Sequence, residues 1–204
     1  MYQTFEAPGG PDFGRKNLPK LRKALNRLGL DGFLIPHEDE YQNEYVPEAL
    51  DRLAWATGFT GSAGAAAVLG DKAAVFVDGR YTLQVRAQVD PQIFHYETFP
   101  EPGLHGWIAR EAKPGQKIGY DPRLFSPDSL DRIRVAAQSA GAILVPVQRN
   151  PIDEAWGAQR PPIPLTPAVP HPEEFTGESA ASKRRRLGAD LEKAGADAAV
   201  ITSP

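Results

Sequence analysis

Helical and strand-like patterns of hydrophobic residues alternate through the first 148 residues of this chain. Four leucines share one face of residues 17–29, which is typical of an amphipathic helix, and short continuous apolar runs mark buried strands. Two of these runs are joined by Gly70-Asp71 as a hairpin. Because strands alternate with helices while the hairpin reverses the chain, we expect an α/β domain with a mixed sheet flanked by helices.

The expected elements follow one another along the chain with short connections. The helices are predicted at residues 17–29, 48–56, 81–89, 103–113 and 126–141, and the strands at 31–36, 65–70, 71–80, 94–99, 117–121 and 142–147. Ser126 or Asp128 is the expected cap of the last of these helices.

Residues 187–202 repeat the pattern of residues 21–36 without a gap. Leu187 matches Leu21 and Gly195 matches Gly29, and both segments consist of an amphipathic helix, a glycine cap and an apolar run. Such a unit also arises by convergence, but the ungapped match favours an internal duplication. The chain is therefore expected to be a fragment of a longer protein, with the truncated start of a second, similar domain.

Proline density separates the two copies. Seven prolines fall within residues 150–175, and this density resists both helices and central strands. The first residues are rich in glycine and proline as well. We therefore predict an irregular arm at 1–16, an α/β domain at 17–148, a proline-rich linker at 149–175, and the first helix and strand of a truncated second domain at 176–204.

The composition is that of an ordinary globular protein and excludes several classes. Hydrophobic residues make up 41% of the chain and charged residues 24%. A net charge of -3 gives no electrostatic case for nucleic acid or an anionic membrane, and no apolar run approaches the ~20 residues of a membrane span. The absence of cysteine excludes disulfides and thiolate metal sites. Without a signal peptide pattern at the start, a cytoplasmic location is expected.

Two polar stretches are candidates for chemistry, and each has a simpler interpretation. The stretch GFTGSAG at 58–64 leads into a strand rather than a helix, which favours a tight turn over a phosphate loop. The stretch HEDEYQNEY at 37–45 holds four carboxylates and a histidine. A metal site is conceivable there, but the histidines lack ligand spacing, so a solvated acidic loop is favoured.

The stretch VFVDGRY places Asp78 and Arg80 at the end of a buried strand, where α/β domains present groups to ligands. An arginine in that position can clamp a carboxylate or face a partner surface. Equally, Asp78 can form a structural ion pair with Arg80 or with Arg52, and the sequence leaves these alternatives open.

Several motifs taken together and in order resemble the N-terminal part of Xaa-Pro aminopeptidases, of the long, three-domain cytosolic type within the creatinase/prolidase superfamily. The motifs are DEYQNEYVP (39–47), RLAWATGFTGSAG (52–64), FVDGRYTLQVRAQVD (76–90), IGYDP (118–122) and AWGAQRPPIPL (155–165). The resemblance extends over residues 17–204. It implies two related, creatinase-like N-terminal α/β domains followed by a C-terminal "pita-bread" catalytic domain.

The resemblance also implies what this fragment lacks. In that family two divalent metal ions, usually manganese, lie in the catalytic domain, so this fragment is expected to hold no catalytic residue and no metal, and to be inactive alone. The implied partners are its own C-terminal catalytic domain, peptide substrates with proline at the second position, and further copies in a homo-oligomer. Creatinase or prolidase chemistry, or a stand-alone binding or scaffold module, are the alternatives.

A few residues of this chain match positions in the family's motifs. The resemblance implies that Arg80, in DGRY, approaches the substrate mouth. It also places Glu44, Tyr45, Arg52 and Asp78 at family positions, without assigning their roles. Tyr41 departs from the pattern because the family often has histidine there.

Overall fold

The computed structural model describes residues 8–201, which divide into a compact unit 1 ending at Pro164 and a unit 2 beginning at Leu165. Unit 1 is built on one six-stranded sheet with the spatial order β4-β3-β2-β1-β5-β6. The strands are β1 Gly32–Pro36, β2 Gly64–Leu69, β3 Lys72–Val77, β4 His95–Thr98, β5 Lys117–Tyr120 and β6 Ile143–Pro146.

Only β2 runs against the other strands of the sheet. It pairs antiparallel with both β1 and β3, whereas the β1–β5, β5–β6 and β3–β4 pairs are parallel. The hairpin between β2 and β3 turns at Gly70, whose φ of 59° lies in the left-handed region that glycine adopts readily. The predicted mixed sheet is therefore confirmed, and one edge collects the carboxyl ends of five strands together with the start of β2.

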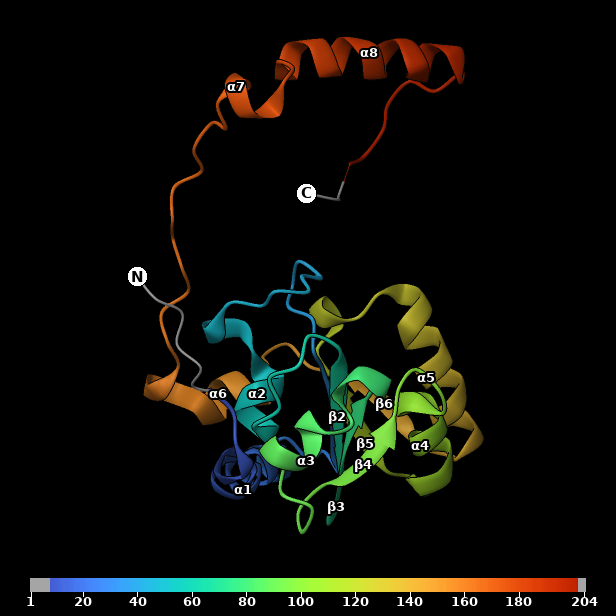
Figure 1. Ribbon diagram of the computed structural model, residues 1–204. Coiled ribbons are helices and arrows are strands. Elements are labelled where there is room, and N and C mark those ends of the chain that lie inside the picture. The colour runs from blue at the N-terminus through green and yellow to red at the C-terminus, as the bar shows by residue number, and fades with distance from the viewer. Residues whose placement is uncertain (1–7, 202–204) are drawn as a thin grey trace. The chain divides into compact units, whose positions relative to one another are not determined.

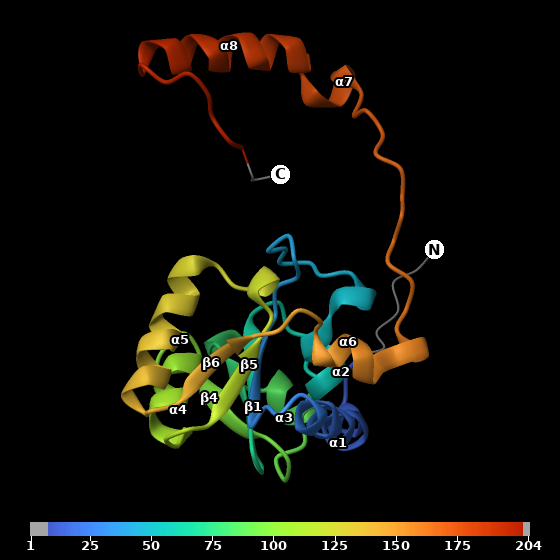
Figure 2. The same cartoon turned by 180° about the vertical axis from the view of Figure 1, so that it is seen from behind.

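Helices cover both faces of this sheet (Figures 1 and 2). They are α1 Pro11–Arg27, α2 Arg52–Thr57, α3 Gln84–Gln88, α4 Gly103–Glu111, α5 Pro127–Ser139 and α6 Pro151–Trp156. Helices α1, α2, α3 and α6 share one core layer with the sheet, and α4 and α5 share the other. Ser126 caps α5 by accepting a hydrogen bond from the Ser129 amide, which decides between the two predicted caps.

Strand β1 is buried on both faces, which explains its unbroken apolar run. Phe33 and Ile35 pack in the layer of α1, while Leu34 packs in the layer of α4 and α5. On that second side, Trp107 of α4 meets Phe76 of β3 edge-to-face, with ring centroids 6.1 Å apart. The two layers thus hold the sheet in place from both sides.

Two helices begin at prolines where the sequence predicts irregular chain. Helix α1 begins at Pro11, so the predicted irregular arm is wrong for residues 11–16, while residues 1–7 lie outside the described residues. Helix α6 begins at Pro151, inside the predicted linker, with Asn150 as its cap. Proline is favoured at the first position of a helix because its missing N–H is not needed there. The density of prolines therefore predicted irregular chain at two places where a proline instead begins a helix.

A buried guanidinium joins α6 to the rest of unit 1. Arg52 is only 2% exposed; its Nε donates to Oδ1 of Asp153 at 2.7 Å, and its Nη2 donates to Oε1 of Glu40 at 2.7 Å. Arg160 Nη1 lies 3.0 Å from the other oxygen of Asp153. Burial alone would lower the pKa of Arg52, but the hydrogen bonds to Asp153 and Glu40 raise it above its ordinary value. We call these four residues the Arg52 cluster.

Unit 2 contains α7 Glu173–Thr176 and α8 Ala180–Lys193. The end of α8 repeats the end of α1: Ala196 donates its amide to Leu191 O at 3.0 Å, just as Leu30 donates to Leu25 O at 3.0 Å. Gly195 and Gly29, which precede these donors, have φ angles of 68° and 64°. The shared geometry supports the duplication.

The strand expected after α8 does not form in residues 196–201, and residues 202–204 lie outside the described part. A strand needs a neighbour to pair with its backbone groups, and unit 2 contains none among its described residues. No helix in the described residues is long and apolar enough to cross a membrane.

Replacing Arg52 with methionine should lower the free energy of unfolding of unit 1 by about 3 kcal/mol, because Glu40 and Asp153 lose their buried cation. Chemical denaturation followed by tryptophan fluorescence measures this change. Arg27→Met is the control: its pair with Glu154 also joins α6 to α1, but both side chains are half-exposed, so the expected loss is below ~1 kcal/mol. Equal losses for the two variants would contradict the assignment.

Amide hydrogens of α8 should exchange with solvent much faster than those of α5. The helices have similar lengths of 14 and 13 residues, but α5 buries Leu130, Ile133, Ala136 and Ala137, whereas α8 buries no side chain. An isolated helix of this length is marginal in water. Exchange followed by mass spectrometry tests the difference, and equal protection of the two helices would show that α8 is packed in solution.

Candidate functional site at the carboxyl edge of the sheet

The reversed strand β2 brings three loops to the carboxyl edge of the sheet. Ala65 of β2 pairs with Pro36 at the end of β1, and Gly64 pairs with Val77 at the end of β3. The loops after β1 and β3 therefore flank the turn at 58–63 that precedes β2. Crevices outside the carboxyl ends of strands are where open α/β sheets bind ligands.

Five residues from these three loops form a connected group, which we call the Arg80 cluster. Asp78 Oδ2 accepts a hydrogen bond from Arg80 Nη2 at 2.7 Å. The guanidinium carbon of Arg80 lies 5.3 Å from the ring centroid of Tyr81. The Tyr81 hydroxyl lies 2.9 Å from Ser62 Oγ, and Ser62 Oγ donates to Glu44 Oε1 at 3.0 Å. The cluster thus runs from the loop after β1 to the loop after β3.

Arg80 is held in one orientation although its side chain is 65% exposed. Asp78 also accepts a hydrogen bond from the backbone N–H of Arg80 at 2.9 Å, which caps the short 3-10 turn Gly79–Tyr81. The hydrogen bond to Asp78 raises the pKa of Arg80, and the same contact lowers the pKa of Asp78. Arg80 therefore presents a permanent, oriented cation to solvent.

Side-chain hydrogen bonds order the acidic loop that follows β1. The buried Asp39 carboxylate accepts hydrogen bonds from the amides of Tyr41 and Asn43 at 2.9 and 3.1 Å. His37 Nε2 lies 2.8 Å from the carbonyl oxygen of Glu44. The interpretation as a solvated acidic loop is therefore wrong in part: the loop is built around a buried carboxylate. It displays Tyr41 and Tyr45, which are 80% and 85% exposed.

The stretch 58–64 is a tight turn, as predicted. Gly58 ends α2 with a φ of 85°. A Cβ on Gly61 would lie only 2.4 Å from Phe59 Cζ and 2.7 Å from Tyr81 Cδ1. Glycine is required there because the turn packs directly against the aromatic ring of the Arg80 cluster.

The structure brings together three of the five residues singled out from the sequence. Glu44, Asp78 and Arg80 meet in the Arg80 cluster, and Asp78 pairs with Arg80 rather than with Arg52. Arg52 lies in its own buried cluster, and Tyr45 points into solvent.

Sequence reasoning missed two members of the cluster, Ser62 and Tyr81. Both stand inside motifs that drew attention, GFTGSAG and VFVDGRY. No sequence signal shows that the two side chains touch, because their contact depends on the pairing of β2 with β3.

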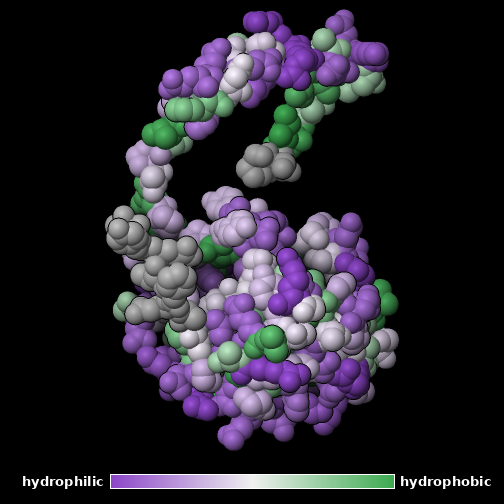
Figure 3. Space-filling view, viewed as in Figure 1, coloured by the Kyte–Doolittle hydropathy of each residue, from purple (hydrophilic) through white to green (hydrophobic). Residues whose placement is uncertain are grey.

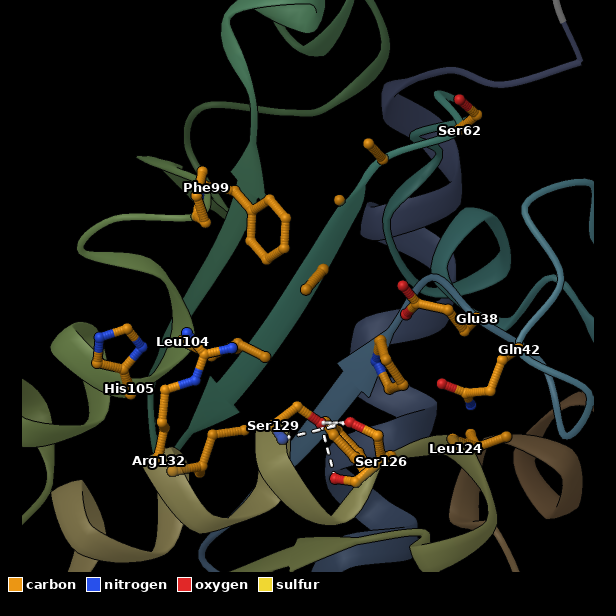
Figure 4. A pocket seen from close by; sticks show the side chains of 17 residues that line it. Glu38, Gln42, Ser62, Phe99, Leu104, His105, Leu124, Ser126, Ser129 and Arg132 are labelled. Atoms are coloured by element: carbon orange, nitrogen blue, oxygen red, sulfur yellow. Dashed lines mark hydrogen bonds between the residues drawn. The ribbon is translucent and has the colours of Figure 1, made fainter. Parts of the chain in front are cut away.

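A cavity of about 250 Å³ opens beside the cluster, on the side of the sheet covered by α4 and α5 (Figure 4). Its lining includes the end of β1, the start of β2, the segment after β4 and the first turns of α5. Glu38, Ser62, Phe99, His105 and Arg132 are among the side chains that line it. The carboxyl edge therefore has a charged cluster on one side and a small hollow on the other.

The acidic loop does not form a metal site. Glu40 is bound to Arg52, Glu44 to Ser62, and Asp39 to the amides of its own loop. Within residues 8–201, no three or more histidine, aspartate or glutamate side chains are grouped so that they could hold a metal ion. These donors therefore do not suit a dinuclear metal centre.

The surface of unit 1 drawn in Figure 3 is mostly hydrophilic, with hydrophobic residues scattered over it. Isolated apolar residues of this kind are normal for a folded domain. On the face that Figure 3 draws, recognition would therefore depend on polar side chains rather than on an apolar patch.

Comparison with known proteins places these features in a family. Residues 18–154 match the family model described as Creatinase/Prolidase N-terminal domain, and residues 159–204 match a second model with the same description. The second match covers the segment that repeats the first helix of unit 1. The duplication inferred from the sequence is thus supported by two matches of related models.

Similar proteins of known type agree with this match. The chain is 36% identical to human Xaa-Pro aminopeptidase 2 over 180 residues, covering 87% of this chain and 26% of that protein. It is 35% identical to the "Probable Xaa-Pro aminopeptidase P" of Coccidioides posadasii over 194 residues, covering 94% and 30%.

The solved X-prolyl aminopeptidase of Caenorhabditis elegans, described as a cytosolic enzyme with a di-nuclear active site, is 29% identical with a TM-score of 0.78. The match covers 92% of this chain and 33% of that one. The chain therefore spans about a quarter to a third of the length of these relatives. Sequence, fold and family models agree that the chain belongs to the creatinase/prolidase N-terminal domain family.

Proposed function

We propose that this chain is the N-terminal, non-catalytic part of a metallo-aminopeptidase that hydrolyses the N-terminal Xaa-Pro bond of peptides. The catalytic site would lie in a C-terminal domain of the complete protein and hold two divalent metal ions, which we propose to be manganese. The Xaa-Pro aminopeptidases among the relatives, each about three to four times longer than the matched part, support this assignment.

The Arg80 cluster is the part of this chain that would shape the substrate mouth. Its guanidinium is exposed, yet two contacts fix it: the carboxylate of Asp78 and the face of the Tyr81 ring. A cation oriented before binding loses little freedom when it meets a carboxylate or a peptide carbonyl. This pre-oriented exposed cation at the carboxyl edge is the observation that supports the role.

Contacts between domains and between copies would use the acidic loop beside this cluster. Tyr41 and Tyr45 are exposed on a loop that Asp39 holds from within, and tyrosine is enriched at protein interfaces. The proposed partners are the chain's own C-terminal catalytic domain and further copies in a homo-oligomer, with peptides carrying proline at the second position as substrates. A cytoplasmic location is proposed from the cytosolic relative.

The complete protein, supplied with manganese, should release alanine from the tripeptide Ala-Pro-Ala, whereas the 204-residue chain should not. Liberated amino acid measured by chromatography gives both rates. Hydrolysis of the dipeptide Ala-Pro without the tripeptide would favour prolidase chemistry, and hydrolysis of creatine would favour creatinase chemistry. Turnover by the 204-residue chain alone would overturn the non-catalytic assignment.

Arg80→Ala in the complete protein should lower kcat/KM for Ala-Pro-Ala by roughly 10- to 100-fold, the range expected when a charge-assisted hydrogen bond is lost. The melting temperature should not change measurably, because the pair with Asp78 is exposed. Arg86→Ala is the control, since Arg86 is an exposed arginine of α3 that makes no ion pair among the described residues. A fall in melting temperature with unchanged kcat/KM would show that Arg80 is only structural.

A further inference from the structure

The cavity at the carboxyl edge has the size of a small polar metabolite. It measures about 250 Å³ and lies between the strand ends and helices α4 and α5 (Figure 4). Sites for drug-sized ligands usually measure ~300–1,000 Å³. The volume therefore suits a small occupant such as a single amino acid or a dipeptide.

Two charged side chains of opposite sign line this cavity without a partner. In the described part of the chain, neither Glu38 nor Arg132 makes an ion pair or a side-chain hydrogen bond, although both line the cavity. Figure 4 shows them on opposite sides of it. Other arginines at this edge are paired: Arg80 with Asp78 and Arg123 with Asp121. Glu38 and Arg132 therefore keep their charges available to a ligand.

The walls between the two charges combine apolar surface with polar groups, which include hydroxyl groups and the side chains of Gln42 and His105. Phe99, Leu104 and Ile133 supply hydrophobic surface. Ser126 and Ser129 bond to each other at the start of α5, and their oxygens retain further lone pairs for a ligand. A cavity with apolar walls and a few convergent polar groups is the usual form of a small-molecule site.

We propose that this cavity binds a free dipeptide, with its ammonium group at Glu38 and its carboxylate at Arg132. Opposite charges at the two sides select a zwitterion, because each end of the ligand neutralises one of them. Two extended residues span up to about 7 Å, so a dipeptide can keep its charged ends apart. The apolar walls contact its side chains. The site would bind whether or not the complete protein hydrolyses Xaa-Pro bonds.

An NMR titration of the 204-residue chain with alanyl-leucine tests the proposal. The chemical shifts of the backbone amides report the binding. N-acetyl-alanyl-leucine lacks the ammonium group and alanyl-leucine amide lacks the carboxylate. The affinity of each blocked peptide should be at least roughly tenfold lower than that of alanyl-leucine, because one charge-assisted contact is lost. Shifts should concentrate at the residues that line the cavity.

Substitutions of the two charged residues assign each end of the ligand. Glu38→Gln should weaken the binding of alanyl-leucine until it binds no more tightly than N-acetyl-alanyl-leucine. Arg132→Gln should weaken it until it binds no more tightly than alanyl-leucine amide. Arg134→Gln is the matched control on the same helix, because Arg134 pairs with Asp131 and does not line the cavity. It should bind like the unaltered chain.

Several outcomes would overturn the proposal. These are equal binding of all three peptides, binding unchanged by Glu38→Gln and Arg132→Gln, and no binding at millimolar concentration. Free alanine binding as tightly as alanyl-leucine would also contradict it, because the second residue would then contribute nothing. Each of these results is independent of whether the complete protein is an aminopeptidase.

Discussion

The reversal of β2 within an otherwise parallel sheet is the constraint on which the candidate site depends. If β2 ran with its neighbours, the turn at 58–63 would lie at the opposite edge of the sheet, away from the loops after β1 and β3. Because β2 is antiparallel to both neighbours, Ser62 instead meets Tyr81 and Glu44. The hairpin at Gly70 therefore determines which side chains can act together.

A second constraint keeps that edge in shape. Burying a guanidinium is costly unless carboxylates neutralise it, and Arg52 meets this condition with Glu40 and Asp153. Glu40 belongs to the acidic loop and Asp153 to α6, so the cation links two segments more than one hundred positions apart in sequence. Asp39 then orders the rest of the loop from within. The position of Glu44 beside Ser62 follows from both contacts.

The carboxyl edge presents two recognition features of different character. The Arg80 cluster is exposed, pre-paired and suited to contact with a large partner or a passing peptide. The cavity between the strand ends and helices α4 and α5 is small, and its side chains Glu38 and Arg132 are unpaired. The two meet at Ser62, which donates to Glu44 and also lines the cavity. A ligand in the cavity and a contact at the Arg80 cluster would therefore share one hydroxyl group.

The sequence by itself determined the family and most elements of the α/β domain. Apolar periodicity located the helices and strands, the hairpin followed from Gly70-Asp71, and ordered motifs indicated the creatinase-like domain. The tertiary structure alone decided that Pro11 and Pro151 begin helices, and that Asp78 pairs with Arg80 while Arg52 pairs with Glu40 and Asp153. The physical reason is that periodicity reports which face of an element is buried, whereas the partner of a charge depends on which loops the strand pairing brings together.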